Sequence, residues 1–305
     1  MAGYTVLGEV VVDRIHIDGK VQDIPGGSAA NCALALSKIA PNVKFLARFS
    51  TDQFGELLFQ TALSNGLDVS DAVRCEQPAT LVNVRLKDDG SPNYEFLMNG
   101  SADWHWRESE LAKHDLTTQS AFIYGSLAAI LDESYNTLQS WLAANKHQKL
   151  LIAYDPNARP TAIAKEQADL IRNRILELVK SANVVKVSDE DLNWIAPNSD
   201  PLKIASSWSQ LGPELVVLTK GSDGACAFRN GICIANVPGI KTQVIDTVGA
   251  GDTLMAWLIA GLVELPENQR FNAGLVESAL RKAVKAAAIT CSRSGCNPPE
   301  LVEVS

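Results

Sequence analysis

The sequence contains little positive charge. Its 305 residues include 27 lysines and arginines against 35 aspartates and glutamates, which gives a formal net charge of -8. Proteins that bind nucleic acid usually present clustered basic side chains. The longest basic group here, Arg281-Lys282 with Lys285, is sparse and has helical spacing. It is typical of a solvated helix face, and we expect no nucleic-acid partner.

Long apolar runs are also absent from the sequence. The most apolar helical segment, residues 254–265, is interrupted by Gly261 and Glu264 and is too short to cross a membrane. The first residues, Met1 to Gly8, carry neither a basic segment nor a cleavage signal and are typical of a first β-strand. We therefore expect a cytoplasmic protein without a membrane partner.

The six cysteines and four histidines lack the close paired spacings of zinc sites and redox motifs. Cys291 and Cys296 lie near each other, but no neighbouring histidine or second cysteine pair completes a ligand set. We expect no transition-metal site, and we expect most of the cysteines to be buried free thiols.

Apolar residues are plentiful and regularly distributed. Hydrophobic residues make up 46% of the chain and charged residues 20%, which is the balance of a globular protein with a large core. Short apolar runs alternate with segments of helical apolar spacing, such as residues 29–39 and 170–179. This alternation predicts an α/β protein with a doubly wound, mainly parallel sheet flanked by helices. The strands are expected at residues 4–7, 43–49, 121–124, 150–153, 183–187 and 215–218.

Two stretches, at about residues 10–25 and 80–100, break this alternation. In each of them apolar residues are interleaved with polar ones, and the second contains the turn Asp88-Asp89-Gly90-Ser91-Pro92. A hairpin with one apolar face is not stable alone. We therefore expect the two stretches to pair into a small β-sheet that forms a lid, inserted in a single domain of residues 1–305.

The segment Asp246-Thr247-Val248-Gly249-Ala250-Gly251-Asp252 leads directly into a stretch with helical apolar spacing. N–H groups at a helix start bind anions with the help of the helix dipole, and residues without bulk let a phosphate approach the backbone. A carboxylate at Asp252 would repel that phosphate unless it had a chemical task. Its natural task is to accept a proton from a substrate hydroxyl. The simpler alternative is a helix start that Asp252 stabilises only through the dipole.

A second glycine-rich segment, Pro25-Gly26-Gly27-Ser28-Ala29-Ala30-Asn31, opens the predicted helix at residues 29–39. Asn31 lies one turn inside this helix, where its amide can bind hydroxyl groups. Asp13 follows the first strand and belongs to the same neighbourhood, and a carboxylate commonly accepts two hydroxyl hydrogens of a polyol. The alternative role for Asn31 is to hold a neighbouring loop. The presence of this second segment favours the catalytic interpretation of Asp252.

Neither segment matches the common nucleotide-binding loops. The chain contains no Gly-Lys-Ser or Gly-Lys-Thr and therefore no Walker A loop, and neither segment is a G-x-G-x-x-G dinucleotide fingerprint. Asp52-Gln53-Phe54-Gly55 has one residue too many for the protein-kinase motif. A dehydrogenase or a protein kinase is accordingly disfavoured against a kinase for a small hydroxylated metabolite.

Taken together, these segments resemble the PfkB family of carbohydrate kinases, which have the ribokinase-like fold, and the resemblance covers nearly the whole chain. The matching segments are Gly8-Glu9 with Asp13, Gly26-Gly27-x-x-x-Asn31-x-Ala33, Asp52-x-Phe54-Gly55 and Asp246 to Asp252. Residues 286–296 look like the family's closing segment near the adenine and a monovalent cation. Asp155-Pro156-Asn157-x-Arg159 and the stretch from Asn99 to Asp103 are most similar to those of fructokinases and the related aminoimidazole riboside and 2-keto-3-deoxygluconate kinases.

The resemblance implies a role for each candidate residue. Asp252 would be the general base. Gly249, Ala250 and Gly251 would form the anion hole, and Arg159 would help neutralise the phosphates. The sugar would bind to Asp13, Gly26, Gly27, Asn31 and Asn99. ATP would lie along Lys186, Ser188, Thr219, Lys220, Gly221 and Gly251.

The resemblance also implies Mg²⁺ and a monovalent cation, K⁺, the latter near Asp246. Many family members have an Asn-x-x-Glu sequence that organises Mg²⁺ and its waters, and the matching positions here are Ser188 and Asp191. Ser-x-x-Asp keeps an oxygen acceptor and a carboxylate but shortens both, and Mg²⁺ tolerates this because it retains several waters. The ion is therefore expected to be held through water by Asp191 or Glu190.

The reaction implied by the resemblance is ATP-dependent phosphorylation of a sugar hydroxyl, with conversion of fructose to fructose 6-phosphate as the expected case. 2-Keto-3-deoxygluconate, aminoimidazole riboside, ribose and nucleosides are the alternative substrates. A non-catalytic regulator that binds sugar or nucleotide is an alternative of another class, since a fold alone does not establish chemistry. The exposed ribbons of the lid also allow a homodimer.

Overall fold

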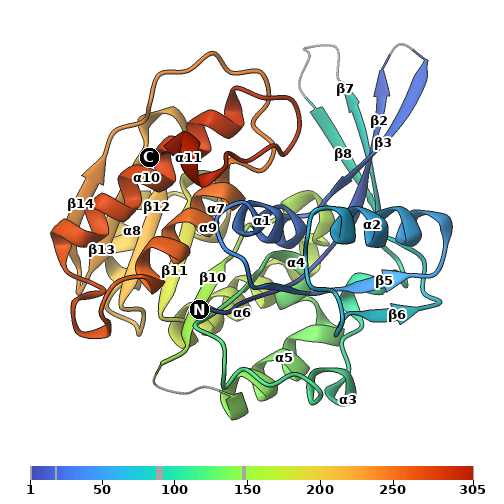
Figure 1. Ribbon diagram of the computed structural model, residues 1–305, viewed down its shortest axis with the longest axis horizontal. Helices are drawn as coiled ribbons and strands as arrows, with labels where there is room; N and C mark the ends of the chain where they lie inside the picture. The colour runs from blue at the N-terminus through green and yellow to red at the C-terminus, as the bar shows by residue number, and fades with distance from the viewer. Residues whose placement is uncertain (1, 18, 87–91, 146–148, 305) are drawn as a thin grey trace.

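A computed structural model of the chain describes residues 2–17, 19–86, 92–145 and 149–304 (Figure 1). Its centre is an eight-stranded sheet in the order β14-β13-β12-β11-β10-β9-β1-β4. Neighbouring strands from β12 to β4 are parallel, whereas β13 and β14 are antiparallel to the strands before them. The parallel strands are β1 (Tyr4–Leu7), β4 (Val43–Leu46), β9 (Ala121–Gly125), β10 (Leu151–Asp155), β11 (Val184–Ser188) and β12 (Leu215–Thr219).

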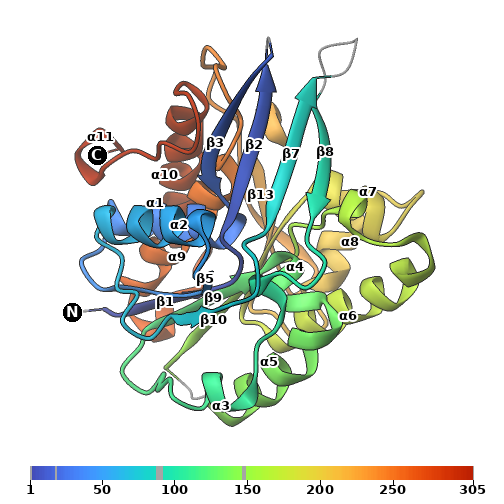
Figure 2. The same ribbon diagram turned by 90° about the vertical axis from the view of Figure 1, so that its right-hand side faces the viewer.

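Helices cover both faces of this sheet (Figures 1 and 2) and enclose two apolar cores. One core is built with α1 (Ser28–Ser37), α2 (Gln53–Ser64), α9 (Ala250–Val263), α10 (Ala273–Cys291) and α11 (Leu301–Val304). The other is built with α3 (Glu108–Leu111), α4 (Ser126–Ile130), α5 (Asp132–Asn145), α6 (Ala168–Ser181), α7 (Asp189–Ile195) and α8 (Pro201–Trp208). Consecutive strand residues such as Val184 and Val185 enter opposite cores, as the two-residue period of a strand requires. The predicted doubly wound α/β fold is confirmed.

Short 3₁₀ helices complete the connections between these elements. They are η1 (Ala102–Trp104), η2 (Pro160–Ala162), η3 (Lys165–Gln167), η4 (Gly221–Asp223) and η5 (Glu267–Gln269). In the part of the chain that the structure describes, no helix combines the length and the apolar character needed to cross a bilayer.

The strand predictions need two corrections. The apolar run at residues 43–49 forms two strands, because the chain leaves the main sheet at the buried Ala47 and β5 (Arg48–Ser50) then pairs with β6 (Val73–Cys75) in a separate two-stranded sheet. The strands β13 (Ala225–Arg229) and β14 (Ile232–Val237) were not predicted. Their hairpin turn at Asn230-Gly231 was the available signal, because this pair is typical of tight hairpins.

The expected small sheet is present and contains four strands in the order β3-β2-β7-β8, which we call the lid. These strands are β2 (Val11–Ile17), β3 (Lys20–Gly26), β7 (Leu81–Leu86) and β8 (Pro92–Leu97). Each hairpin is antiparallel, and the two hairpins join through the parallel pair β2 and β7. The lid projects from the helical body (Figure 2). Residues 88–91 of the predicted turn lie outside the described residues.

The cysteines are less buried than predicted. All six are free thiols, but only Cys32 and Cys226 are buried, so the expectation for most of them is wrong. Cys233 is exposed because it lies on β14, the outermost strand of the main sheet. The remaining three are half-buried.

Candidate active site

Two helices begin side by side at one edge of the main sheet, and both follow a glycine. Helix α1 begins after Gly27, which has φ 106°, and α9 begins after Gly249, which has φ 76°. Residues other than glycine rarely adopt these backbone conformations. A Cβ built at Gly27 would also lie 2.7 Å from the carbonyl oxygen of Glu9, and one built at Gly249 would lie 2.3 Å from Sγ of Cys296. Neither glycine can supply a side-chain cap. The Ala250 N–H of α9 donates to the Thr247 carbonyl at 3.3 Å, and the next N–H groups of the turn are left for other partners.

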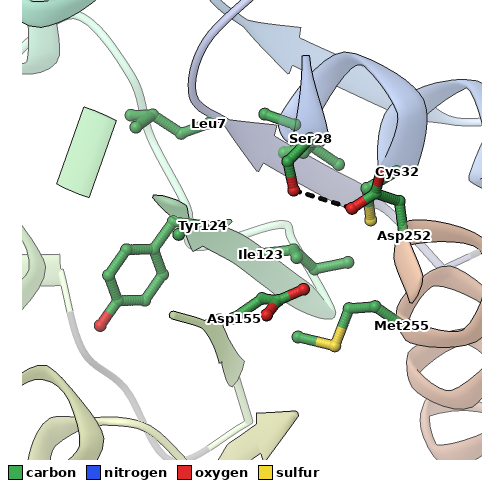
Figure 3. A pocket seen from close by; sticks show the side chains of 11 residues that line it. Leu7, Ser28, Cys32, Ile123, Tyr124, Asp155, Asp252 and Met255 are labelled. Carbon is green, nitrogen blue, oxygen red and sulfur yellow. Dashed lines mark hydrogen bonds between the residues drawn. The ribbon is translucent and has the colours of Figure 1, made fainter. Parts of the chain in front are cut away.

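Asp252 joins the two helix starts. It lies in the first turn of α9 and is 8% exposed. Ser28 Oγ donates a hydrogen bond to Oδ1 of Asp252 at 2.8 Å (Figure 3). Asn31 Nδ2 donates to Oδ2 at 3.0 Å. Two side chains of α1 therefore orient one carboxylate of α9. A carboxylate fixed in this way is suited to accept a proton from a bound hydroxyl.

A buried cation lies directly beside the first turn of α9. Lys186 Nζ is 2.8 Å from Oδ2 of Asp155, and it lies 3.0 Å from the position that a Cβ would take at Gly251. Burial raises the pKa of Asp155 to about 6, although Lys186 lowers it. Burial lowers the pKa of Lys186, but Asp155, Asp191 and Asp252 more than compensate and raise it. The ammonium group thus adds positive charge to the helix start, as an anion site requires.

Ser188 and Asp191, the proposed surroundings of Mg²⁺, hydrogen-bond to each other. Oδ2 of Asp191 accepts from Ser188 Oγ at 2.6 Å and from the Ser188 N–H at 3.2 Å, while Oδ1 accepts from the Ala158 N–H at 2.8 Å. Glu190 is exposed. The described residues contain no group of three or more His, Cys, Asp or Glu side chains able to hold a metal ion. The binding of Mg²⁺ through water by Asp191 or Glu190 stays a prediction, based on the several waters that Mg²⁺ usually retains.

The other predicted nucleotide residues lie on the same edge of the sheet. Thr219 pairs in register with Ser188, and Lys220 and Gly221 follow it at the end of β12. Asp246 holds the loop before α9, because Oδ1 accepts from the Val248 N–H at 3.0 Å and Oδ2 from the Gly295 N–H at 2.9 Å. Its role toward a cation stays a prediction.

The lid supplies a further carboxylate, Asp13 of β2. Asp13 lies against Gly26, where a Cβ would be 2.4 Å from Oδ2. Burial raises the pKa of Asp13 to about 6, and the charge of Arg159 lowers it in part. Burial also raises the pKa of Glu9, against the opposing effects of Ser126 and Arg159. The exposed Arg159 is thus near Asp13 and Glu9, on the side where the sugar was predicted.

The pocket between the main sheet and the starts of α1 and α9 is lined by Asp252 of the predicted residues, together with Ser28 and Asp155. Asn99 is exposed in the turn where the chain returns from β8. Sequence reasoning missed Ser28, although its place directly after Gly27 was a usable signal. It also missed the Lys186–Asp155 ion pair, which depends on β10 and β11 being neighbours in the sheet.

Comparison with known proteins identifies the family. The model of the pfkB family carbohydrate kinases matches residues 2–302. The chain belongs to the PfkB family. The resemblance seen in the sequence is confirmed over nearly the whole chain.

Individual PfkB relatives are similar along almost their full length. A fructokinase of Rhizobium leguminosarum bv. trifolii is 31% identical over 284 residues, which cover 90% of this chain and 84% of the relative. Fructokinase-2 of Oryza sativa subsp. japonica is 30% identical over 277 residues, covering 90% of this chain and 81% of the relative.

Among solved structures, a fructokinase double mutant from Vibrio cholerae O395 in fructose-, ADP- and potassium-bound form has a TM-score of 0.87 at 22% identity, covering 100% of this chain and 97% of that one. The aminoimidazole riboside kinase of Salmonella enterica has a TM-score of 0.81 at 19% identity, and the match covers 99% of this chain and 98% of that kinase. At these identities the likeness establishes the ribokinase-like fold.

Proposed function

We propose that the protein transfers the γ-phosphoryl group of ATP to a sugar hydroxyl, and that its substrate is fructose, which becomes fructose 6-phosphate. The observation that carries this proposal is the carboxylate of Asp252, held by Ser28 and Asn31 at a helix start whose first turn lies beside the buried Lys186. Membership in a carbohydrate kinase family and curated relatives that are fructokinases support it.

The residues divide the reaction between them. The phosphates of ATP lie over Gly249 to Gly251, where the N–H groups of α9 and the Lys186 ammonium stabilise the transferred group. The fructose O6 atom attacks the γ-phosphorus, the bond to the ADP oxygen breaks, and Asp252 takes the hydroxyl proton. Asp13, Asn31 and the Gly26-Gly27 backbone hold the other hydroxyls.

Two ions complete the proposal. Mg²⁺, when bound, would neutralise charge on the phosphates, and Asp191 or Glu190 would hold it through water. Asp246 contributes to a K⁺ site near the loop that it ties to Gly295. Structures of the Vibrio cholerae fructokinase in potassium- and calcium-bound forms support ion binding in this fold.

The lid has two proposed roles. It excludes water, which would otherwise accept the phosphoryl group. Its outer strands β3 and β8 also carry exposed apolar side chains, Val21, Tyr94 and Leu97, which support a homodimer through the lid. In analytical ultracentrifugation we expect the wild type to sediment as a dimer. The double variant Val21→Asp with Leu97→Asp is expected to sediment as a monomer.

The activity is tested by ATP consumption with fructose, ribose, 2-keto-3-deoxygluconate, aminoimidazole riboside and nucleosides, each in the presence of Mg²⁺. The highest kcat/KM is expected with fructose. A higher kcat/KM with another of these substrates would contradict the assignment of the sugar alone. No turnover with any of them would favour a non-catalytic binding protein and contradict the proposed reaction.

A further inference from the structure

Asp103 is a fully buried carboxylate that the proposed reaction does not use. It lies in η1, between the chain's return from the lid and α3, and is 1% exposed. Burying an ionisable group without partners is costly. Its partners therefore indicate what the group does.

Asp103 hydrogen-bonds to the two residues at the base of the lid, Val10 and Thr80, which we call the lid roots. Oδ1 accepts a hydrogen bond from the Val10 N–H at 2.8 Å, and Oδ2 accepts one from Thr80 Oγ1 at 2.5 Å. Val10 directly precedes β2 and Thr80 directly precedes β7, and these are the two central strands of the lid. The Thr80 carbonyl in turn accepts from the Val12 N–H at 3.0 Å. One carboxylate thus fixes the separation of the two strands where both enter the lid.

The segment that carries Asp103 is anchored to the body of the protein. Arg48, which is 2% exposed, donates from Nε to the Ala102 carbonyl at 2.8 Å. Ser134 of α5 is fully buried and donates from Oγ to the Trp104 carbonyl at 2.7 Å. The residues on both sides of Asp103 are therefore held by β5 and α5. Asp103 is fixed relative to the main sheet, and the lid roots are fixed relative to Asp103.

The electrostatics agree with a carboxylate held in place by these two donors. Burial raises the pKa of Asp103 to about 7, and the hydrogen bonds from Thr80 and Val10 lower it from a still higher value. Glu9, the neighbour of Val10, also raises it. Because an apolar side chain would fill the same place without this cost, the hydrogen bonds to the lid are what the carboxylate contributes.

We infer that Asp103 is a positioning residue for sugar phosphorylation: by holding Val10 and Thr80 it sets the place of β2, and with it the place of Asp13 at the sugar site. Asp13 lies on β2, three residues beyond Val10. This inference rests on the proposed function, because Asp13 is the proposed sugar ligand. A displaced lid root weakens sugar binding and leaves the nucleotide edge, formed by β11, β12 and α9, unchanged.

Three variants and a matched control test this inference. Asp103→Ala is expected to raise the KM for fructose by at least about tenfold and Thr80→Val by about threefold to tenfold, with the KM for ATP within about twofold. Asp103→Asn is expected to restore most of the affinity, because its oxygen accepts from Val10 and its amide donates to Thr80. The control is Ser209→Ala, since Ser209 is 2% exposed and hydrogen-bonds the end of α8 to the turn between β13 and β14, far from the lid. It is expected to lower Tm without changing either KM.

Hydrogen exchange of the unliganded protein gives a second measurement that needs no activity. The amides of residues 11–13 and 81–83 are expected to exchange about tenfold faster in Asp103→Ala and Thr80→Val than in the control. The inference is overturned if both variants lose as much Tm as Ser209→Ala while fructose KM and lid exchange stay at wild-type values. If Asp103→Ala does not fold, Thr80→Val decides. If the wild type phosphorylates no sugar, the proposed function fails and the link from Asp103 to sugar binding fails with it, whereas faster lid exchange in the variants would still show that Asp103 holds Val10 and Thr80 in place.

Discussion

The starts of α1 and α9 share the same backbone geometry but carry different side chains. Each helix follows a glycine with positive φ, has no side-chain cap, and stands at the same edge of the sheet. They differ in what surrounds them. The start of α1 carries the neutral donors Ser28 and Asn31, whereas the start of α9 carries the carboxylate of Asp252 beside the ammonium of Lys186. The N–H groups of a helix start favour anions, and we expect the neighbouring side chains to decide whether such a start binds a sugar hydroxyl, as proposed for α1, or a phosphate, as proposed for α9.

Removing the negative charge from the start of α9 is expected to have the largest effect. Asp252→Asn keeps the size of the side chain but cannot accept the hydroxyl proton, so kcat should fall by roughly two to four decades. Steady-state kinetics measure the loss, and circular dichroism during heating checks that the fold is intact. Turnover near the wild-type value would refute the assignment of the base.

Removing the cation beneath the same helix start is expected to affect stability. Lys186→Met leaves the buried Asp155 without its partner, which should lower the free energy of unfolding by about 3–5 kcal/mol at neutral pH. Because burial then raises the pKa of Asp155 above its unfolded value, the folded state binds a proton that the unfolded state releases. Stability should therefore fall as pH rises from 5 to 8. Urea unfolding measures both effects.

The matched control for this ion pair is the double variant Lys186→Met with Asp155→Leu. It removes both charges together and should recover most of the lost stability at pH 8. Equal stability of the single and double variants would show that the ion pair is not what supports this part of the core.

The sugar side is expected to respond to pH through Asp13. Its pKa is raised to about 6 by burial, so the side chain loses its charge as pH falls below that value. The KM for fructose should rise about tenfold between pH 7.5 and pH 5, because a neutral carboxyl is a weaker acceptor for hydroxyl groups. Asp13→Asn should have a high KM with little pH dependence over this range. The same pH dependence in that variant would assign the titration to another group.

The smallest effect is expected at the neutral donors of α1. Ser28→Ala removes one of the two hydrogen bonds to Asp252 and leaves the one from Asn31, so kcat should fall by about threefold to tenfold. Stopped-flow or steady-state assays resolve a change of this size. A loss as large as that of Asp252→Asn would mean that Ser28 acts directly on the substrate.

The sequence predicted those parts of the molecule that depend on neighbouring residues. The helix after Gly249, the helix after Gly27 and the parallel strands follow from local spacing, and a resemblance to a known family joined them into one crevice. The lid hairpins were also predicted, since their alternation is local. The position of Asp13 against Gly26 depends on β2 pairing with β3, which the same hairpin pattern indicates.

The rest depends on contacts between residues far apart in the sequence. The Lys186–Asp155 pair exists because β10 and β11 are adjacent, and the hydrogen bonds of Asp103 link three separate segments. No spacing rule reveals such contacts. The division of residues 43–49 into β4 and β5 was missed for a similar reason, because an apolar run looks the same whether it continues in one sheet or passes to another.

The hydrogen bonds of Asp252 also bear on how the protein is made. Ser28 and Asp252 are 224 positions apart, and Asn31 and Asp252 are 221 apart. A chain emerging from the ribosome contains α1 long before α9 has been synthesised, so the glycine-led start of α1 waits without its carboxylate partner for most of translation. With Asp252 as the proposed base, catalytic competence is expected only near the end of synthesis, and a nascent or truncated chain that lacks α9 is expected not to consume ATP.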